Sequence, residues 1–213
     1  MKLGLVGINT ITQIIVRLAK RSDSNIEISL YDDDDAKFGR TFFECKLVGK
    51  CGDVDKAFRN GDIDSAAVCL GEKHLPKKRE IIERLVKIGL HLPRFIDESA
   101  HVSELARLES GVVLNYGAIV GDHTTIKLGT ILWSGAVVEH DSTIGACCYL
   151  GPNVTVSGAV RIGDCTLIGS GAVILPEVHI GSNCLIGAGA VVTKNISDNT
   201  RIVGVPAKPI GAR

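Results

Sequence analysis

The sequence predicts two fold classes in succession, α/β and then all-β: a small parallel α/β sheet, followed by a solenoid of short parallel strands. Three observations support this prediction. Strand-like and helix-like segments alternate over the first 95 residues, and a six-residue repeat runs without insertion from Ala100 onward. The chain of 213 residues also holds 24 glycines but only 4 % aromatic residues, a composition that suits an interior packed by repetition.

The first 95 residues alternate between two kinds of apolar pattern. Helices are expected over residues 10–20 and 76–89, the second with a proline in its first turn and a glycine at its end. Strands are expected over residues 2–8, 26–31, 63–70 and 92–96. Alternating strands and helices favour a parallel sheet, and the boundary with the next domain is expected near residues 93–97.

The rest of the chain divides into hexads. In sixteen successive hexads the third residue is Val, Ile or Leu, and the first is Ala, Val, Thr, Ser or Cys. Glycines recur at the fourth and sixth positions, where tight turns need them. A period of six keeps no face of a helix apolar, so the repeat predicts parallel strands stacked about 4.8 Å apart. Three hexads per turn would give about five triangular coils.

Composition and charge exclude several classes of protein. Lysine and arginine (24) balance aspartate and glutamate (24), which argues against nucleic acid or an anionic membrane as an electrostatic partner. No stretch approaches the roughly 18 apolar residues that span a bilayer, and the first residues do not resemble a signal peptide. Seven cysteines without a CxxC pair indicate reduced thiols. We therefore expect a cytoplasmic protein.

Three motifs carry a resemblance to a known family: VEHDSTIG at residues 138–145, GAGAVVTK at 187–194 and GVPAKPI at 204–210. With them the chain resembles, over nearly its whole length, the hexapeptide-repeat acyltransferases of the sialic-acid O-acetyltransferase and nucleotide-amino-sugar N-acetyltransferase group. The resemblance implies a Rossmann-like nucleotide-sugar-binding domain at residues 1–95, a left-handed parallel β-helix at 96–202 and a C-terminal tail at 203–213. The left hand is an exception to the usual right-handed crossover. It also implies a homotrimer with active sites in grooves between neighbouring β-helices.

His140 is the first candidate catalytic residue. It occupies the fifth position of its hexad, a turn position, and an imidazole that titrates near neutral pH suits proton removal from an attacking amine or hydroxyl. The resemblance makes it the general base, with Asp141 orienting its ring; the alternative is a solvated turn histidine. Gly158 lies eighteen residues on, one coil further. In the family the glycine at this position binds the thioester carbonyl oxygen through its N–H, whereas the alternative is an ordinary turn glycine.

The resemblance assigns acetyl-CoA to four further residues. Tyr149 stands where some relatives carry a second histidine that touches the acetyl donor. Ser170 and Ala188 match positions that line the pantetheine groove, although such residues also serve turns. Lys208 would reach the CoA phosphates, or is a solvated lysine of the tail.

Trp133 departs from the family, because relatives often carry an asparagine at this position, seven residues before His140. A single tryptophan in a chain so poor in aromatics is either a wall of the acceptor pocket or an anchor at the trimer interface.

The acceptor is assigned to the N-terminal domain. Relatives place a glycine-rich loop after the first strand, but here residues 7–12 keep only the first glycine, and side-chain donors take the place of backbone contacts. Asn9 and Thr10 are the candidate side-chain donors of this loop. The resemblance also assigns the nucleotide-linked sugar to Asp32 and Asp33, after the second strand, and to Gly71, after the third; the alternative for the two aspartates is a solvated acidic turn.

Metal catalysis is rejected. The histidines of the repeat region are His101, His123, His140 and His179, and no two have the spacing of the zinc sites in β-helical carbonic anhydrases.

The sequence thus predicts an acetyl-CoA-dependent N-acetyltransferase that acts on the amine of a nucleotide-linked 4-amino-deoxy sugar. One alternative is O-acetylation of sialic acid or of another sugar hydroxyl. A second, from a different class, is a non-catalytic β-helix scaffold, which would not be stabilised by CoA.

Overall fold

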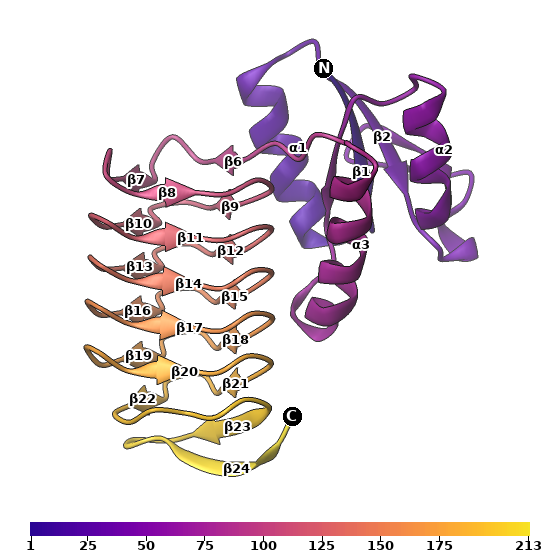
Figure 1. Ribbon diagram of the computed structural model, residues 1–213. Helices are drawn as coiled ribbons and strands as arrows, with labels where there is room; N and C mark the ends of the chain where they lie inside the picture. The colour runs from indigo at the N-terminus through magenta and orange to yellow at the C-terminus, as the bar shows by residue number, and fades with distance from the viewer. The chain divides into compact units, whose positions relative to one another are not determined.

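The computed structural model describes all 213 residues, which form two compact units, Met1–Phe95 and Ile96–Arg213 (Figure 1). The first unit contains a five-stranded sheet in the order β3-β4-β2-β1-β5. Its strands are β1 (Lys2–Val6), β2 (Glu27–Tyr31), β3 (Thr41–Phe42), β4 (Cys45–Gly49) and β5 (Ser65–Val68). β1 pairs in parallel with β2 and β5, β4 pairs in parallel with β2, and β3 closes the edge as an antiparallel strand.

The helices of this unit are α1 (Thr10–Ser22), α2 (Val54–Arg59) and α3 (Leu75–Lys87). Three short 3-10 turns accompany them: η1 (Asp35–Lys37), η2 (Cys51–Asp53) and η3 (Glu72–His74). α1 buries Ile11, Ile15 and Leu18, which lie three to four residues apart on one face, so its burial follows the predicted pattern. The sequence did not predict β3, β4 or α2, which are short and carry little periodicity.

The strand expected over residues 92–96 is different in the structure. Only Phe95–Ile96 is a strand, β6, and it lies in the same sheet as the solenoid strand β9 rather than in the α/β sheet. His91 makes one isolated bridge to Ser65 of β5. Pro93 has no N–H to donate, which prevents this ladder from continuing.

The second unit is a parallel β-helix with one two-residue strand per hexad. The strands run from β7 (His101–Val102) to β22 (Val191–Val192). Between them lie β8 Arg107–Leu108, β9 Val113–Leu114, β10 Ile119–Val120, β11 Thr125–Ile126, β12 Ile131–Leu132, β13 Val137–Val138, β14 Thr143–Ile144, β15 Tyr149–Leu150, β16 Thr155–Val156, β17 Arg161–Ile162, β18 Leu167–Ile168, β19 Val173–Ile174, β20 His179–Ile180 and β21 Leu185–Ile186.

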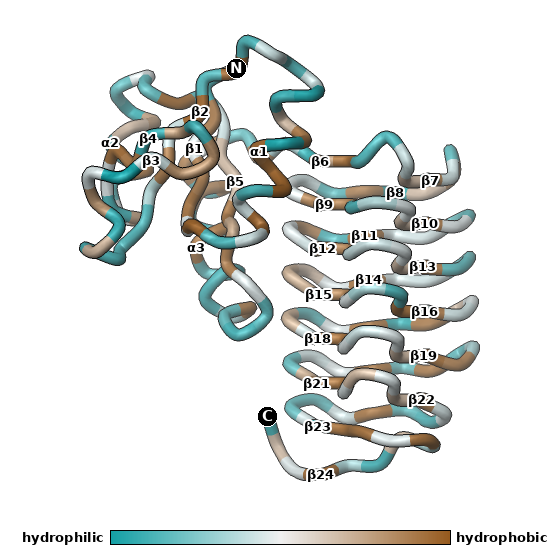
Figure 2. The backbone as a smooth tube through the Cα atoms, turned by 180° about the vertical axis from the view of Figure 1, so that it is seen from behind, coloured by the Kyte–Doolittle hydropathy of each residue, from teal (hydrophilic) through white to brown (hydrophobic).

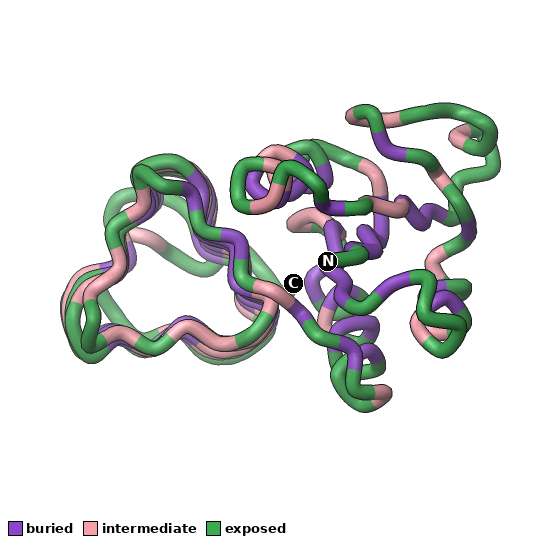
Figure 3. Tube along the Cα trace, turned by 90° about the horizontal axis from the view of Figure 1, so that it is seen from above, coloured by how far each residue is buried: buried purple, intermediate pink, exposed green.

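Three sheets form the sides of a triangular coil (Figure 3). The first sheet contains β7, β10, β13, β16, β19 and β22; the second contains β8, β11, β14, β17 and β20; the third contains β6, β9, β12, β15, β18, β21, β23 and β24. We call the turns from the first to the second sheet the first corner, those from the second to the third sheet the second corner, and those from the third back to the first sheet the third corner. Within each sheet, hexad strands pair in parallel with strands eighteen residues away, as Ile119 does with Val137.

The repeating aliphatics point inward. From Leu114 onward the third residues of successive hexads are buried, as Val138 and Ile144 are, whereas Val102 and Leu108 in the first coil are partly buried. Hydrophobic stretches recur in the strands of each coil (Figure 2). Because each aliphatic stacks on the one a coil away, the core is one continuous column.

The first position of several hexads carries a hydroxyl or a thiol that makes a hydrogen bond within the coil. Its hydroxyl or thiol donates to the carbonyl of the residue fifteen positions on: Thr130 to Gly145, Thr166 to Gly181 and Cys148 to Gly163. Cys148 therefore occupies a serine- or threonine-like position and ties one strand to a turn. All seven cysteines are free thiols.

The predicted tail contributes to the β-helix. β23 (Thr200–Val203) pairs in parallel with β21, and β24 (Lys208–Ala212) folds back antiparallel on β23. The turn between them contains a cis peptide bond before Pro206. No helix in the structure is both long and apolar enough to cross a membrane.

Candidate active site

His140 lies at the first corner, in the turn between β13 and β14. Its side chain is 61 % exposed, and its Nδ1 lies 2.8 Å from Oδ2 of Asp141. Asp141 has a φ of 58°, a left-handed conformation that aspartate tolerates better than most residues. The turn thus directs the carboxylate of Asp141 to one nitrogen of the ring, and the other, Nε2, makes no hydrogen bond within the chain.

The charges around His140 favour its protonated form. The hydrogen bond to Asp141 raises the pKa of the imidazole above its ordinary value, and the charges of Asp141, Glu139 and Asp122 act in the same direction. Burial opposes this shift without cancelling it. A histidine with a raised pKa is a stronger base once it is deprotonated.

Gly158 lies directly against the ring of His140. A Cβ placed on Gly158 would come within 2.6 Å of both Cε1 and Nε2 of the imidazole, so only glycine leaves room for the ring in this position. The backbone N–H of Gly158 donates no hydrogen bond within the chain, whereas its carbonyl accepts one from the N–H of Glu177. The structure therefore brings an unpaired N–H, a glycine and an oriented imidazole together at one corner.

The second corner has a different character. At equivalent positions there, side chains of the next coil accept from the backbone N–H groups: Asp164 from Ala146, Ser182 from Asp164, and Asp198 from Ser182. These side chains tie the turns to one another. The second corner thus lacks the free backbone donor that Gly158 provides at the first.

Trp133 and Tyr149 lie together. Trp133 follows β12 at the third corner, Tyr149 lies on β15 of the third sheet, and their ring centroids are 5.6 Å apart at an interplanar angle of 48°. The indole Nε1 of Trp133 is buried and has no hydrogen-bond partner. A buried donor without a partner is unfavourable in the isolated chain, so this indole differs from an ordinary packed tryptophan.

Ser170 and Ala188 are exposed at the third corner, one coil apart. Gly151 and Gly169 lie against their backbones: a Cβ on Gly151 would meet the Ser170 nitrogen at 2.8 Å, and one on Gly169 would meet the Ala188 nitrogen at 2.5 Å. Below Trp133, the surface of this corner therefore forms a strip from which few side chains project. Lys208 is exposed at the start of β24.

Two sets of predicted residues thus lie at different corners of one β-helix. His140, Asp141 and Gly158 share the first corner, whereas Ser170 and Ala188 share the third, and the first sheet separates the two corners. One chain does not bring the two sets together.

The residues predicted for the acceptor follow the carboxyl ends of β1, β2 and β5. Because β2 and β5 flank β1 on opposite sides, this edge of the sheet is a topological switch point, the usual ligand position in parallel α/β sheets. Thr10 is exposed as the first residue of α1, and Gly71 precedes η3 with open space around it.

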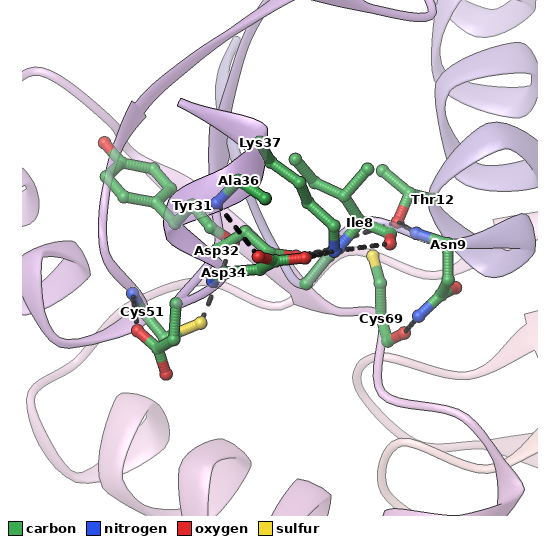
Figure 4. Close-up of polar contacts among 12 residues, drawn as sticks. Ile8, Asn9, Thr12, Tyr31, Asp32, Asp34, Ala36, Lys37, Cys51 and Cys69 are labelled. Atoms are coloured by element: carbon green, nitrogen blue, oxygen red, sulfur yellow. Dashed lines mark hydrogen bonds and ion pairs between the residues drawn. The ribbon is translucent and has the colours of Figure 1, made fainter. Parts of the chain in front are cut away.

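Asn9 is engaged within the protein. It caps α1: its Oδ1 accepts from the N–H of Ile11, and its Nδ2 donates to the carbonyl of Cys69 (Figure 4). Asn9 thus joins the loop after β1 to the end of β5. One of the two N–H donors of its amide is therefore already used.

Asp32 is also engaged, and is only 7 % exposed. Burial raises the pKa of this carboxyl, but hydrogen bonds from the Asp34 N–H, the Lys37 amine and the Ile8 N–H outweigh it, so the pKa lies below its ordinary value. Asp33 is exposed, and its Oδ1 accepts from the N–H of Cys51 at 2.9 Å.

Lys37 was missed by the sequence analysis. Its amine lies 2.9 Å from Oδ2 of Asp32 and 3.3 Å from the carbonyl of Ile8, at the same edge of the sheet. The signal in the sequence was a lysine just after four consecutive aspartates. No group of three or more His, Cys, Asp or Glu side chains in the chain could hold a metal ion.

Comparisons with known proteins show which proteins this chain is similar to. The family described as bacterial transferase hexapeptide (six repeats) matches residues 159–194. The acetyltransferase domain of PglB from Neisseria gonorrhoeae FA1090 superimposes with a TM-score of 0.90 at 28 % identity, over 98 % of this chain and 99 % of that chain. The chain is similar to the hexapeptide-repeat sugar acetyltransferases. No protein of curated description matches the sequence significantly.

Two further similar structures come from Caulobacter crescentus. PerB in complex with CoA and GDP-perosamine has a TM-score of 0.79 at 26 % identity, over 99 % of this chain and 98 % of that chain. A histidine-to-asparagine mutant of perosamine N-acetyltransferase, in complex with the same two molecules, has a TM-score of 0.77 at 25 % identity, over 99 % and 97 %. These similarities extend over both units, so the α/β unit is part of the shared architecture.

Proposed function

We propose that this protein transfers the acetyl group of acetyl-CoA to the amine of a nucleotide-linked 4-amino-deoxy sugar. The coarser statement, a sugar acetyltransferase that uses acetyl-CoA, is supported by the similarity to PglB and PerB. The single observation that carries the finer one is the similarity, over both units, to PerB in complex with CoA and GDP-perosamine. Acetyl transfer itself is supported by the first corner, where His140 lies between Asp141 and Gly158.

The chemistry follows from that corner. The sugar amine attacks the thioester carbonyl carbon while Nε2 of His140 takes a proton from the nitrogen. The N–H of Gly158 donates to the oxyanion of the tetrahedral intermediate. The C–S bond then breaks, and the CoA thiolate accepts the proton from the imidazolium. Asp141 holds the ring and stabilises its cationic form, as the raised pKa of His140 indicates.

Acetyl-CoA fits the third corner. The strip around Gly151 and Gly169 would accept the narrow pantetheine arm along exposed Ser170 and Ala188, and Tyr149 could donate a hydrogen bond to the acyl end. Lys208, near the end of the β-helix, would pair with the CoA phosphates.

A homotrimer would complete the site. Because one chain places its base and its CoA strip at different corners, the first corner of one copy would face the third corner of its neighbour. In that arrangement the partnerless indole N–H of Trp133 would find an acceptor across the interface or in the sugar. We place the protein in the cytoplasm, where acetyl-CoA and reduced thiols occur together.

O-acetylation of sialic acid or of another hydroxyl is the second candidate. It is favoured by the loop after β1, which keeps one glycine and uses the Asn9 amide internally. The same base would serve both reactions.

The test is release of CoA thiol from acetyl-CoA in the presence of UDP-, GDP- or dTDP-linked 4-amino sugars, free sialic acid, or no acceptor. Turnover with a nucleotide amino sugar alone supports the proposal, and turnover with sialic acid alone replaces it with O-acetylation. If CoA does not stabilise the protein against thermal unfolding, the result would favour a non-catalytic β-helix scaffold over an acetyltransferase. The matched control is His140→Ala, which should still bind CoA.

A further inference from the structure

The loop between β1 and α1 has little left to offer an anion. A diphosphate at a helix N-terminus is normally held by free backbone N–H groups. Here four such groups donate within the chain: Gly7 to the Tyr31 carbonyl (2.7 Å), Ile8 to Asp32 Oδ2 (2.7 Å), Asn9 to Thr12 Oγ1 (3.0 Å) and Ile11 to Asn9 Oδ1 (2.8 Å). Of the N–H groups from Gly7 to Ile11, only that of Thr10 donates to no group in the chain, so a phosphate held by several of them would have to displace these bonds.

Lys37 places a cation beside this loop instead. Figure 4 shows its side chain running from η1 to the space between Asp32 and the backbone of Ile8. The side chain is 26 % exposed, so the amine is partly shielded and yet reachable. An ammonium group has three donors, and two are used, on Asp32 at 2.9 Å and on Ile8 at 3.3 Å. Asp34 lies at 3.9 Å, too far for a hydrogen bond.

Of the four consecutive aspartates, only Asp32 forms a hydrogen-bonded ion pair with Lys37, and the other three have partners elsewhere. Asp33 accepts from the Cys51 N–H, Asp34 from the Ala36 N–H, and Asp35 pairs with Lys50 at 2.9 Å. Asp32 accepts from the Ile8 N–H and from Lys37, and so holds the amine against the loop.

We propose that Lys37 binds the diphosphate of the nucleotide-linked acceptor at the carboxyl end of β1. Its third N–H and its charge replace the backbone donors that the loop lacks, and Asp32 positions the amine for this contact. The ligand class is a nucleoside diphosphate, whose charge a partly shielded ammonium recognises through charge-assisted hydrogen bonds. The inference rests on the proposed nucleotide-linked acceptor.

The test compares nucleoside diphosphates with their nucleosides by titration calorimetry on the full chain. UDP, GDP and dTDP are paired with uridine, guanosine and thymidine. For the nucleobase whose diphosphate binds, Lys37→Met should weaken diphosphate affinity by roughly tenfold to a hundredfold, which is the range of one charge-assisted hydrogen bond. The affinity for the nucleoside and for CoA should stay unchanged. Lys37→Arg should restore most of the loss.

Lys50→Met is the matched control, because Lys50 pairs with an aspartate of the same run but makes no contact with the loop. It should change diphosphate affinity less than twofold. Lys37→Gln is the second variant in case the methionine unfolds the unit, with CoA binding and thermal unfolding as checks of the fold. An unchanged diphosphate affinity in the folded variant, or an equal loss for nucleoside and diphosphate, overturns the role of Lys37.

The two proposals fail separately. If the wild-type protein acetylates a nucleotide amino sugar and Lys37→Met binds it equally well, only the role of Lys37 is wrong. If the wild-type protein binds CoA but none of the three diphosphates, the nucleotide-linked acceptor is wrong, and the role of Lys37 is overturned with it.

Discussion

The first corner of the β-helix and the carboxyl edge of the α/β sheet hold their polar groups in opposite ways. At the corner, Nε2 of His140 and the N–H of Gly158 have no partner within the chain. At the sheet edge, the side chains of Asn9 and Asp32 are both engaged in internal hydrogen bonds.

The difference separates two tasks. Groups that react must be positioned by the fold and yet left free, and a rigid coil does this by stacking a glycine against the imidazole. Groups that only shape a binding site can be hydrogen-bonded to one another, because the ligand then contacts a different group that they hold in place. The proposed roles differ accordingly: turnover should depend on residues of the corner, and acceptor affinity on Lys37, which Asp32 holds in place.

The largest effect on turnover is expected for His140→Ala. Loss of the general base should lower turnover by about 10²–10⁴-fold. Because the ring is exposed, the β-helix should keep its thermal stability and its affinity for CoA. The measurement is CoA thiol release with whichever acceptor of the proposed panel supports turnover in the wild-type protein, and near-normal turnover would exclude His140 as the base.

Gly158→Ala should have the next largest effect. The added methyl would come within 2.6 Å of the imidazole and must displace the ring, so turnover should fall roughly tenfold to a hundredfold, as when an oriented catalytic group is misplaced. Gly52→Ala is the control, because a Cβ there meets nothing within 4 Å. An active alanine variant would mean that the contact between Gly158 and His140 does not matter for turnover.

Thr130→Val tests the framework that keeps the corners rigid. Its hydroxyl donates to the Gly145 carbonyl at 2.7 Å and accepts from the Cys148 N–H at 3.0 Å, and valine leaves both groups unpaired in a buried place. We expect a loss of about 1–3 kcal/mol in the free energy of unfolding, measured by denaturant titration. Thr125→Val, which removes an outward hydroxyl with no such bond, is the control and should change stability by less than about 0.5 kcal/mol. Equal losses would contradict the interpretation of the first hexad position.

These two regions also differ in how far the sequence predicts them. A strict six-residue period places every inward aliphatic, such as Ile144, because each coil repeats the geometry of the last. The eighteen-residue coil likewise predicted that Gly158 would lie beside His140, which the structure shows. In the α/β unit, periodicity predicts the longer elements but not the contacts between loops. The position of Lys37 depends on a short turn between strands, where no repeat constrains the side chain.

The smallest effect we expect is a shift in the pH profile caused by Asp141→Asn. The base acts unprotonated, so turnover falls as pH decreases through the pKa of His140. The hydrogen bond that the imidazole donates to Asp141 raises that pKa above its ordinary value of about 6.5. Asparagine removes the charge and tolerates the left-handed backbone at this position. The acid limb of kcat/KM should therefore move to lower pH, and the plateau should fall because the base is weaker and less well oriented.

Glu139→Gln is the control for this shift, because Glu139 acts on His140 only through its charge. The acid limb of kcat/KM in Glu139→Gln should move to lower pH as well, but by less than in Asp141→Asn. A limb that stays in place in Asp141→Asn would mean that the carboxylate does not act on the ring during turnover. The corner would then resemble the sheet edge after all, with Asp141 serving the fold of the turn rather than the proton transfer.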